Sequence, residues 1–355
     1  MKKSAAVFTT IILSLVLGFT ASANGNTGSC DQIENDRYSY EVGISDESWM
    51  EMTYTEKVEA YSISQEILED MTTQQLVQAV MDYPFLVDLT LFNTLEEGYA
   101  HVLSCSNALR ELEKRTDGFM TLIEYYENMP VPIKEEEGDI SIIKLTFAEI
   151  LISNMADKVT VSEKQLDELI KVIDQKDDQK ALASELYGTE SNLRIAGMQV
   201  YRAEFTSHTV KSLKGVNVSV IHYLSDLSTA QKNQENIAYS QAYPQATILG
   251  TATTMYNCAS YAMVNRSTSN IYWLNNLSPT AAGYTRLGSS LTNATAGGVI
   301  YYTRTDSLGS HVGVVHSTNG GKIIIRSKMG IGPLAQHEIQ MCPYYLGNGG
   351  LIFYK

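Results

Sequence analysis

The chain has 355 residues, of which 44% are hydrophobic and 19% charged, and its net charge at neutral pH is −14. This composition is typical of one large or two medium globular domains and excludes a chain that is mainly disordered. The negative charge and the lack of a run of basic residues in the sequence argue against nucleic acid as a partner.

The N-terminus has the three parts of a secretory signal peptide. Two lysines precede an apolar run over residues 5–19, and Ala21 and Ala23 form a small-x-small cleavage site. The apolar run is short for a bilayer span, and no later stretch of the sequence reaches that length. We therefore expect residues 1–23 to be removed from an exported, bacterial protein that is secreted or associated with the cell envelope, without stable membrane insertion.

Residues 24–205 predict an α-helical domain, because apolar side chains recur there at helical spacing. Thr72 with Gln75, and Ser162 with Gln165, form capping boxes that mark two helix starts. Further helices are expected over residues 95–115, 116–126 and 141–155.

Charge is divided unequally between the two halves of the chain. Residues 240–355 carry seven basic and two acidic side chains, a balance of +5, which leaves −19 for residues 1–239. Solvated helix faces explain the acidic surplus most simply. The basic balance would suit docking on an anionic polymer of the cell envelope.

The hydrophobic pattern changes after residue 205. Alternation over residues 209–224, with a turn at Lys214 and Gly215, predicts a hairpin, and the polar stretch 228–235 predicts a link. Residues 206–239 are thus expected to join the helical domain to an α+β domain over residues 240–355. That domain should contain a helix and several antiparallel strands, expected over residues 258–265, 299–303, 311–317, 322–328 and 351–354.

Cys258 and His311 are the candidate catalytic pair. Cys258 follows polar residues at the expected start of a helix, where the helix dipole and free N–H groups lower a thiol pKa and can hold an oxyanion. His311 opens a strand and could point toward that helix end. An imidazole beside a thiol can activate it and later protonate a leaving amine.

The segments around this pair resemble the landmarks of NlpC/P60 and CHAP cysteine peptidases and amidases, which are small papain-like domains. They are residues 257–258 at the helix start, 297–302 as the next strand, and 310–315. The chain is most similar to exported bacterial proteins with the pattern Tyr-Asn-Cys-His-Ser-Tyr-Ala-Trp, then Ser-Lys-Trp-Gly, then His before Cys-Pro-Tyr. Here the corresponding residues are 256–263, 327–330, and His337 before 342–344.

This resemblance implies a papain-like domain in which Cys258 is the nucleophile and His311 the base, with peptidoglycan stem peptide, or its amide link to sugar, as the substrate class. It implies no metal and no organic cofactor. The chain departs from the pattern at Ala259, Met263, Gly298 and Met329, where the similar proteins carry His, Trp, Asp and Trp.

The third member of the site comes from hairpin register. If residues 319–321 form a three-residue loop, residue 313 pairs with 327, and Ser327 shares a sheet face with His311. Other registers bring Arg326 or Lys328 to that face, where a cation would oppose a protonated imidazole. Ser327 is therefore the expected orienting residue, and His337, expected in a loop, is the alternative.

Two other readings stay open. Four cysteines in an exported chain permit disulfides, with Cys258 paired to Cys342 and Cys30 to Cys105. The protein would then be a non-catalytic binding module for a cell-wall or protein ligand on a papain-like scaffold. An acyl transferase could use the same Cys258 and His311 pair. The oligomeric state is not predicted.

Overall fold

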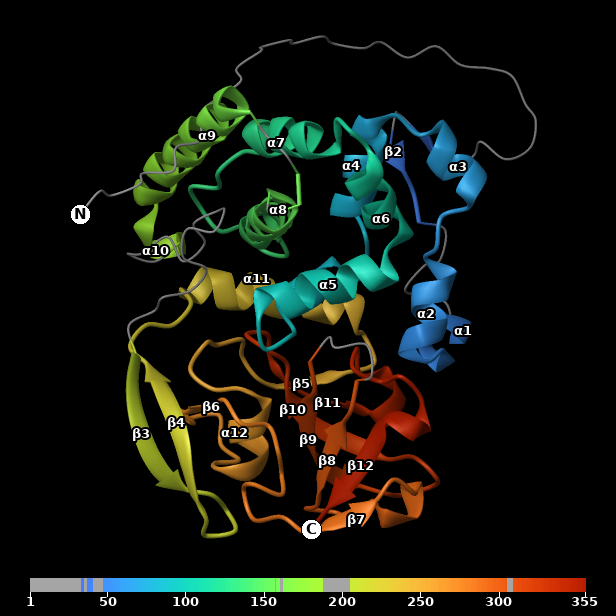
Figure 1. Ribbon diagram of the computed structural model, residues 1–355, viewed down its shortest axis with the longest axis vertical. Helices are drawn as coiled ribbons and strands as arrows, with labels where there is room; N and C mark the ends of the chain where they lie inside the picture. The colour runs from blue at the N-terminus through green and yellow to red at the C-terminus, as the bar shows by residue number, and fades with distance from the viewer. Residues whose placement is uncertain are drawn as a thin grey trace.

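The structure is a computed structural model. It describes residues 33–34, 37–40, 47–156, 158–159, 162–187, 205–304 and 309–355. The predicted signal peptide and Cys30 lie outside these residues. The fold is α+β: a helical N-terminal region over residues 48–187 precedes an antiparallel-sheet region that contains a helix (Figure 1). The predicted fold class is confirmed at this level.

The helical region is built from short, capped helices. Both predicted capping boxes are present, at Thr72 and at Ser162. The helices before the sheet region are α1 (Glu47–Glu51), α2 (Tyr54–Ala60), α3 (Gln65–Asp70), α4 (Thr73–Met81), the 3₁₀ helix η1 (Leu86–Leu89), α5 (Leu95–Cys105), α6 (Asn107–Lys114), α7 (Gly118–Asn128), α8 (Ser141–Ala156), α9 (Glu163–Ala181) and α10 (Ser184–Tyr187). Two short strands, β1 (Ile33–Glu34) and β2 (Arg37–Tyr38), precede them.

The prediction of a single helix over residues 95–115 is wrong, because α5 ends at Cys105 and a second helix, α6, begins after Ser106. Ser106 adopts an extended backbone and its side chain accepts the N–H of Leu109, which caps α6. Asn107 then bonds to both backbone groups of Ile63, so α6 is turned onto an earlier segment.

The sheet region holds a seven-stranded antiparallel sheet in the order β5-β11-β10-β9-β8-β12-β7 and a three-stranded sheet in the order β3-β4-β6. The strands predicted at 299–303, 311–317, 322–328 and 351–354 are present within two residues, and the predicted hairpin is present but begins four residues earlier, at Phe205. The strands are β3 (Phe205–Lys211), β4 (Asn217–Tyr223), β5 (Thr247–Gly250), β6 (Trp273–Leu274), β7 (Arg286–Gly288), β8 (Val299–Tyr302), β9 (His311–Ser317), β10 (Ile324–Lys328), β11 (Leu334–Glu338) and β12 (Leu351–Tyr354).

The polar link predicted over residues 228–235 is wrong, since these residues begin helix α11 (Thr229–Ala242). Ser228 and Gln231 form a capping box. Gln234 and Glu235 are fully buried, and the Gln234 side chain accepts the N–H groups of Ile142 and Ile143 at the start of α8. These buried side chains bond to the helical region, which is why the stretch is polar without being a loop.

One continuous core joins the two regions. Buried side chains from Tyr38 to Phe353 belong to a single hydrophobic cluster that includes α4, α8, α11 and one face of the large sheet. Helices α5 and α11 lie along the boundary between helices and sheet (Figure 1). Within the described residues, no helix has the length and apolar character needed to cross a bilayer.

The backbones of the two regions approach each other at Gly330, and a substitution there tests this contact. Gly330 has φ +44°, and a Cβ there would overlap the carbonyl oxygens of Thr90 and Phe92. We expect Gly330→Ala to lower the free energy of unfolding by more than about 3 kcal/mol, because strain and a backbone clash add. Gly320→Ala is the matched control, since Gly320 also has positive φ but has open space around it.

Urea unfolding of both variants provides the measurement. Gly320→Ala should lower the free energy of unfolding by about 1 kcal/mol, because only the strain of positive φ is present there. Equal losses at the two positions would contradict the close backbone contact.

Candidate active site

Cys258 is the first residue of α12 (Cys258–Met263), which is two residues shorter than predicted. Asn257 caps this helix: its Oδ1 accepts the N–H of Ser260 at 3.0 Å. The same amide bonds to both backbone groups of Leu274 in β6. The position of Cys258 is therefore fixed from two elements.

The Cys258 sulfur is fully buried. Burial raises the pKa of its thiol to about 12, although the backbone N–H groups of Val312 and Ala259 point to the sulfur and oppose this shift. Cys258 and Cys342 are both free thiols, so the alternative disulfide between them is not formed, and Cys105 is also a free thiol. The arrangement is a neutral thiol held among N–H donors.

His311 is also fully buried, as the first residue of β9. Its ring stacks on Tyr344, with centroids 4.4 Å apart, and lies 5.7 Å from Tyr302. Burial, with a smaller effect of His337, lowers the pKa of His311 to about 3. Within the part of the chain that the structure describes, neither ring nitrogen has a hydrogen-bond partner.

Ser327 lies where the register argument put it. Pairs Ile325 with Val315 and Arg326 with Val314 continue to Ser327 opposite Gly313, so Ser327 shares a face with His311. The connection between β9 and β10 is longer than three residues, and a bulge next to Ile324 restores the expected register.

His337 lies in strand β11 and is buried, so the loop predicted for it is wrong. Pairing with Ile325 places it on the same face as Ser327. Its Nδ1 donates to the carbonyl of Glu338 at 2.9 Å, which leaves Nε2 to accept the Ser327 hydroxyl at 3.0 Å. The two candidates for the third position thus bond to each other, and the ring of His337 is held as a neutral tautomer.

The structure brings Cys258 against the start of β9 without bonding it to His311. Val312 and Val314 pack in the cluster that contains α12, whereas the His311 ring lies on the other face of the sheet with Ser327. No hydrogen bond joins Cys258 to His311 among the described side chains. An active pair requires the His311 ring to leave its stack on Tyr344.

Lys328 holds the backbone around the site by hydrogen bonds, a role that could not be predicted from the sequence. Its buried ammonium donates to the carbonyls of Thr253, Gly330 and Gly332 at 2.6 to 3.0 Å. Burial lowers its pKa to about 7, whereas its hydrogen bonds to three carbonyls favour the ammonium form. Lys328 ties the segment before Cys258 to the turn after β10.

Asn93 is the second contributor that the sequence analysis missed. It belongs to the helical region, yet its Oδ1 accepts from the Cys258 sulfur at 3.6 Å. No local pattern near residue 93 points to this role, because 165 residues separate the two side chains. Only the packed interface brings them together.

A metal site is not evident in the described part of the chain: no group of three or more His, Cys, Asp or Glu side chains is arranged to hold an ion. No family model matches the chain, and comparisons with curated proteins and with solved structures found no match.

The buried His311 predicts a pH dependence of stability. Its pKa is about 3 in the folded chain and about 6.5 when exposed, so between these values only the unfolded chain binds the proton. The free energy of unfolding therefore falls as pH drops below 6.5. Between pH 7 and pH 5, wild type should lose about 2 kcal/mol more than His311→Gln in urea unfolding.

Exposed His316 supplies the control for this experiment. His316→Gln should keep the wild-type pH dependence. If the free energy of unfolding of His311→Gln varied with pH as steeply as that of wild type, His311 would not be buried as a neutral ring.

Lys328 gives a prediction about stability. Lys328→Met leaves three buried carbonyls without their donor, and we expect a loss of about 3 to 5 kcal/mol by urea unfolding. Exposed Lys322→Met should change the value by no more than about 0.5 kcal/mol. Similar losses of unfolding free energy in the two variants would contradict a stabilising role of the three Lys328 hydrogen bonds.

Proposed function

We propose that the chain is an exported cysteine hydrolase with a papain-like domain of the NlpC/P60 or CHAP type, which cleaves an amide bond in peptidoglycan or in a peptide. The observation that carries this proposal is the position of Cys258: it begins α12 and packs in one cluster with Val312 of β9, the strand that His311 opens. Backbone hydrogen bonds from Val312 and Ala259 lower the pKa of its thiol, against the larger effect of burial. Such donors stabilise a thiolate and can hold the oxyanion of a tetrahedral intermediate.

The proposed reaction has two steps. His311 takes the thiol proton, and the Cys258 sulfur bonds to the carbonyl carbon of the substrate. The C–N bond then breaks, and the amine leaves with the proton from the imidazole. Water attacks the thioester, releases the acid and restores the thiol, so no oxidant, metal or cofactor enters the balance.

The third position belongs to Ser327 and His337 together. Their hydrogen bond fixes the His337 ring on the sheet face that His311 shares. The Glu338 carbonyl fixes the tautomer of His337, and the Ser327 hydroxyl donates to the free Nε2. We assign both as positioning residues.

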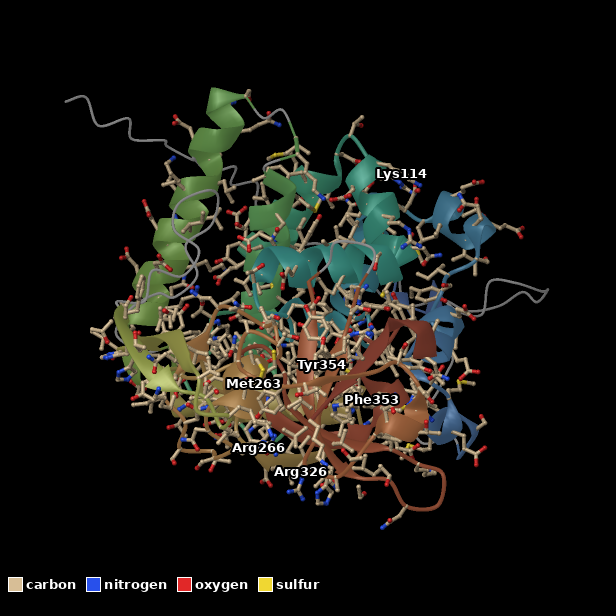
Figure 2. The ribbon with its side chains drawn as sticks, turned by 60° about the horizontal axis from the view of Figure 1, so that its bottom comes forward. Lys114, Met263, Arg266, Arg326, Phe353 and Tyr354 are labelled. Atoms are coloured by element: carbon tan, nitrogen blue, oxygen red, sulfur yellow. The ribbon has the colours of Figure 1, made fainter. Side chains whose placement is uncertain are left out.

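The charge of the sheet region supports an anionic substrate polymer. Arg266 and Arg326 lie on the side of this region away from the helical Lys114 (Figure 2). Both are close enough to Tyr261 to act on its hydroxyl electrostatically. Together with the +5 balance of residues 240–355, they favour peptidoglycan over a neutral polysaccharide.

A specific observation also favours the second candidate, a non-catalytic binding module. The Cys258 sulfur is buried and is not bonded to His311 in this conformation. Acyl transfer is a third outcome, in which an amine replaces water in the second step.

Hydrolysis by the chain from residue 24 tests the proposal. Purified peptidoglycan and a mixed peptide library are incubated with wild type, Cys258→Ser and Cys105→Ser, and new amino groups are identified by mass spectrometry. We expect Cys258→Ser to abolish release, at least 1000-fold, because it removes the nucleophile. Cys105→Ser should retain it.

His311→Ala should also reduce the rate of release, by more than about 100-fold, which is the usual contribution of a general base. Binding to peptidoglycan without any release by wild type would favour the binding module. New amide bonds to an added amine would identify acyl transfer.

A further inference from the structure

The segment between η1 and α5 lies directly on the sheet region. The carbonyl of Thr90 accepts the N–H of Ile331 at 3.1 Å, and the carbonyl of Leu91 accepts the Tyr344 hydroxyl at 3.3 Å. The Thr90 hydroxyl donates to the buried Glu235 at 2.5 Å. We call residues 90–94 the crossing loop.

Asn93 is the residue of the crossing loop that covers the candidate nucleophile. Its Nδ2 donates to the carbonyl of Ser310 at 3.2 Å, while its Oδ1 accepts from the Cys258 sulfur at 3.6 Å. The Glu97 carboxylate accepts the backbone N–H groups of Asn93 and Thr94, which holds the loop at the start of α5. The amide therefore lies between the sulfur and the space outside it.

That space is a cleft of about 240 Å³ between the two regions. Its lining residues are Phe92, Asn93, Thr94, Leu95 and Glu96 from the helical region, and Tyr223, Thr254, Trp273 and Ile331 from the sheet region. It is smaller than the roughly 300 Å³ at which pockets begin to take drug-sized ligands. It has room for one residue of a substrate.

Asn93 connects the cleft to the site, because it belongs to both. Asn93 lines the cleft and touches the sulfur. Thr254 precedes Cys258 by four residues, and Trp273 precedes Leu274, which bonds to the cap residue Asn257. The Asn93 side chain is thus the barrier between the cleft and the sulfur.

The crossing loop cannot act as a removable mask. Phe92 packs on Tyr344 with centroids 4.2 Å apart, and Gly330 and Gly332 lie against the loop backbone and Leu91. The same core cluster runs through the loop into both regions. Releasing the loop would open that core, whereas rotating the Asn93 side chain breaks only its two hydrogen bonds.

We propose that this cleft receives an apolar residue of a peptide substrate on the acyl side of the scissile bond, and that Asn93 is the gate between the cleft and Cys258. The inference rests on the proposed function, because it assigns a substrate to the same nucleophile. The occupant is apolar because five of the nine lining residues are aliphatic or aromatic: Phe92, Leu95, Tyr223, Trp273 and Ile331. Glu96 at the exposed rim disfavours an acidic residue there.

The gate is tested by alkylation of Cys258, which needs no turnover. The chain from residue 24 is treated with iodoacetamide at pH 8, and labelling of Cys258 is followed by mass spectrometry. Asn93→Ala should accelerate labelling at least tenfold, because it uncovers the sulfur. Asn128→Ala, an exposed asparagine of α7, should label like wild type.

The cleft is tested in the Asn93→Ala background with two peptide chloromethyl ketones that carry phenylalanine or aspartate next to the reactive carbon. The phenylalanine reagent should label Cys258 at least tenfold faster. Adding Trp273→Ala should remove this preference. Urea unfolding of each variant checks folding independently of labelling, and Tyr223→Leu replaces Trp273→Ala as the cleft variant if the latter is not folded.

The outcomes separate this inference from the proposed function. No acceleration by Asn93→Ala would overturn the gate, and equal rates for the two ketones would overturn the apolar subsite. Fast, selective labelling in a protein that hydrolyses no substrate would support the gated cleft and count against the hydrolase.

Discussion

The contact between the crossing loop and the turn after β10 is the constraint on which the rest of the molecule depends. Ile331, Tyr344 and Glu235 bond to the loop from three separate segments of the sheet region. Gly330 is needed because the loop backbone lies where any side chain would project. This contact makes two regions with different secondary structure into one core, and it carries an amide from the helical region onto the sulfur of the sheet region.

Lys328 shows how the same constraint reaches the nucleophile from the other side. Its ammonium bonds to the segment before Cys258 and to the turn that receives the crossing loop. A buried charge is costly unless all its donors are paired, and here three carbonyls pair them. The Ser-Lys-Met-Gly stretch therefore has a structural reason: the lysine fixes the turn, and the glycine that follows two residues later admits the loop.

Local patterns predicted much of the fold, and long-range packing produced the differences. Capping boxes located α4 and α9, and alternation located β9 and β12, because these signals depend only on neighbouring residues. The capping box at Ser228 was hidden by a polar composition that is explained by buried partners in α8. Cys258, His311 and Ser327 could be selected from sequence, but Asn93 could not, since its role exists only after the crossing loop is packed.

The electrostatics of the closed site follow from water exclusion. Burial is the largest cause of both the raised pKa of Cys258 and the lowered pKa of His311, so each group is held neutral, the reverse of a thiolate and imidazolium pair. Water that enters when Asn93 rotates lowers that cost for Cys258, whereas the His311 ring lies on the other face of the sheet and must first leave Tyr344. The N–H groups of Ala259 and Val312 are already in place to favour the thiolate when this happens. A single side-chain rotation at Asn93 therefore has a chemical consequence as well as a steric one, because it changes the solvation that keeps the Cys258 thiol neutral.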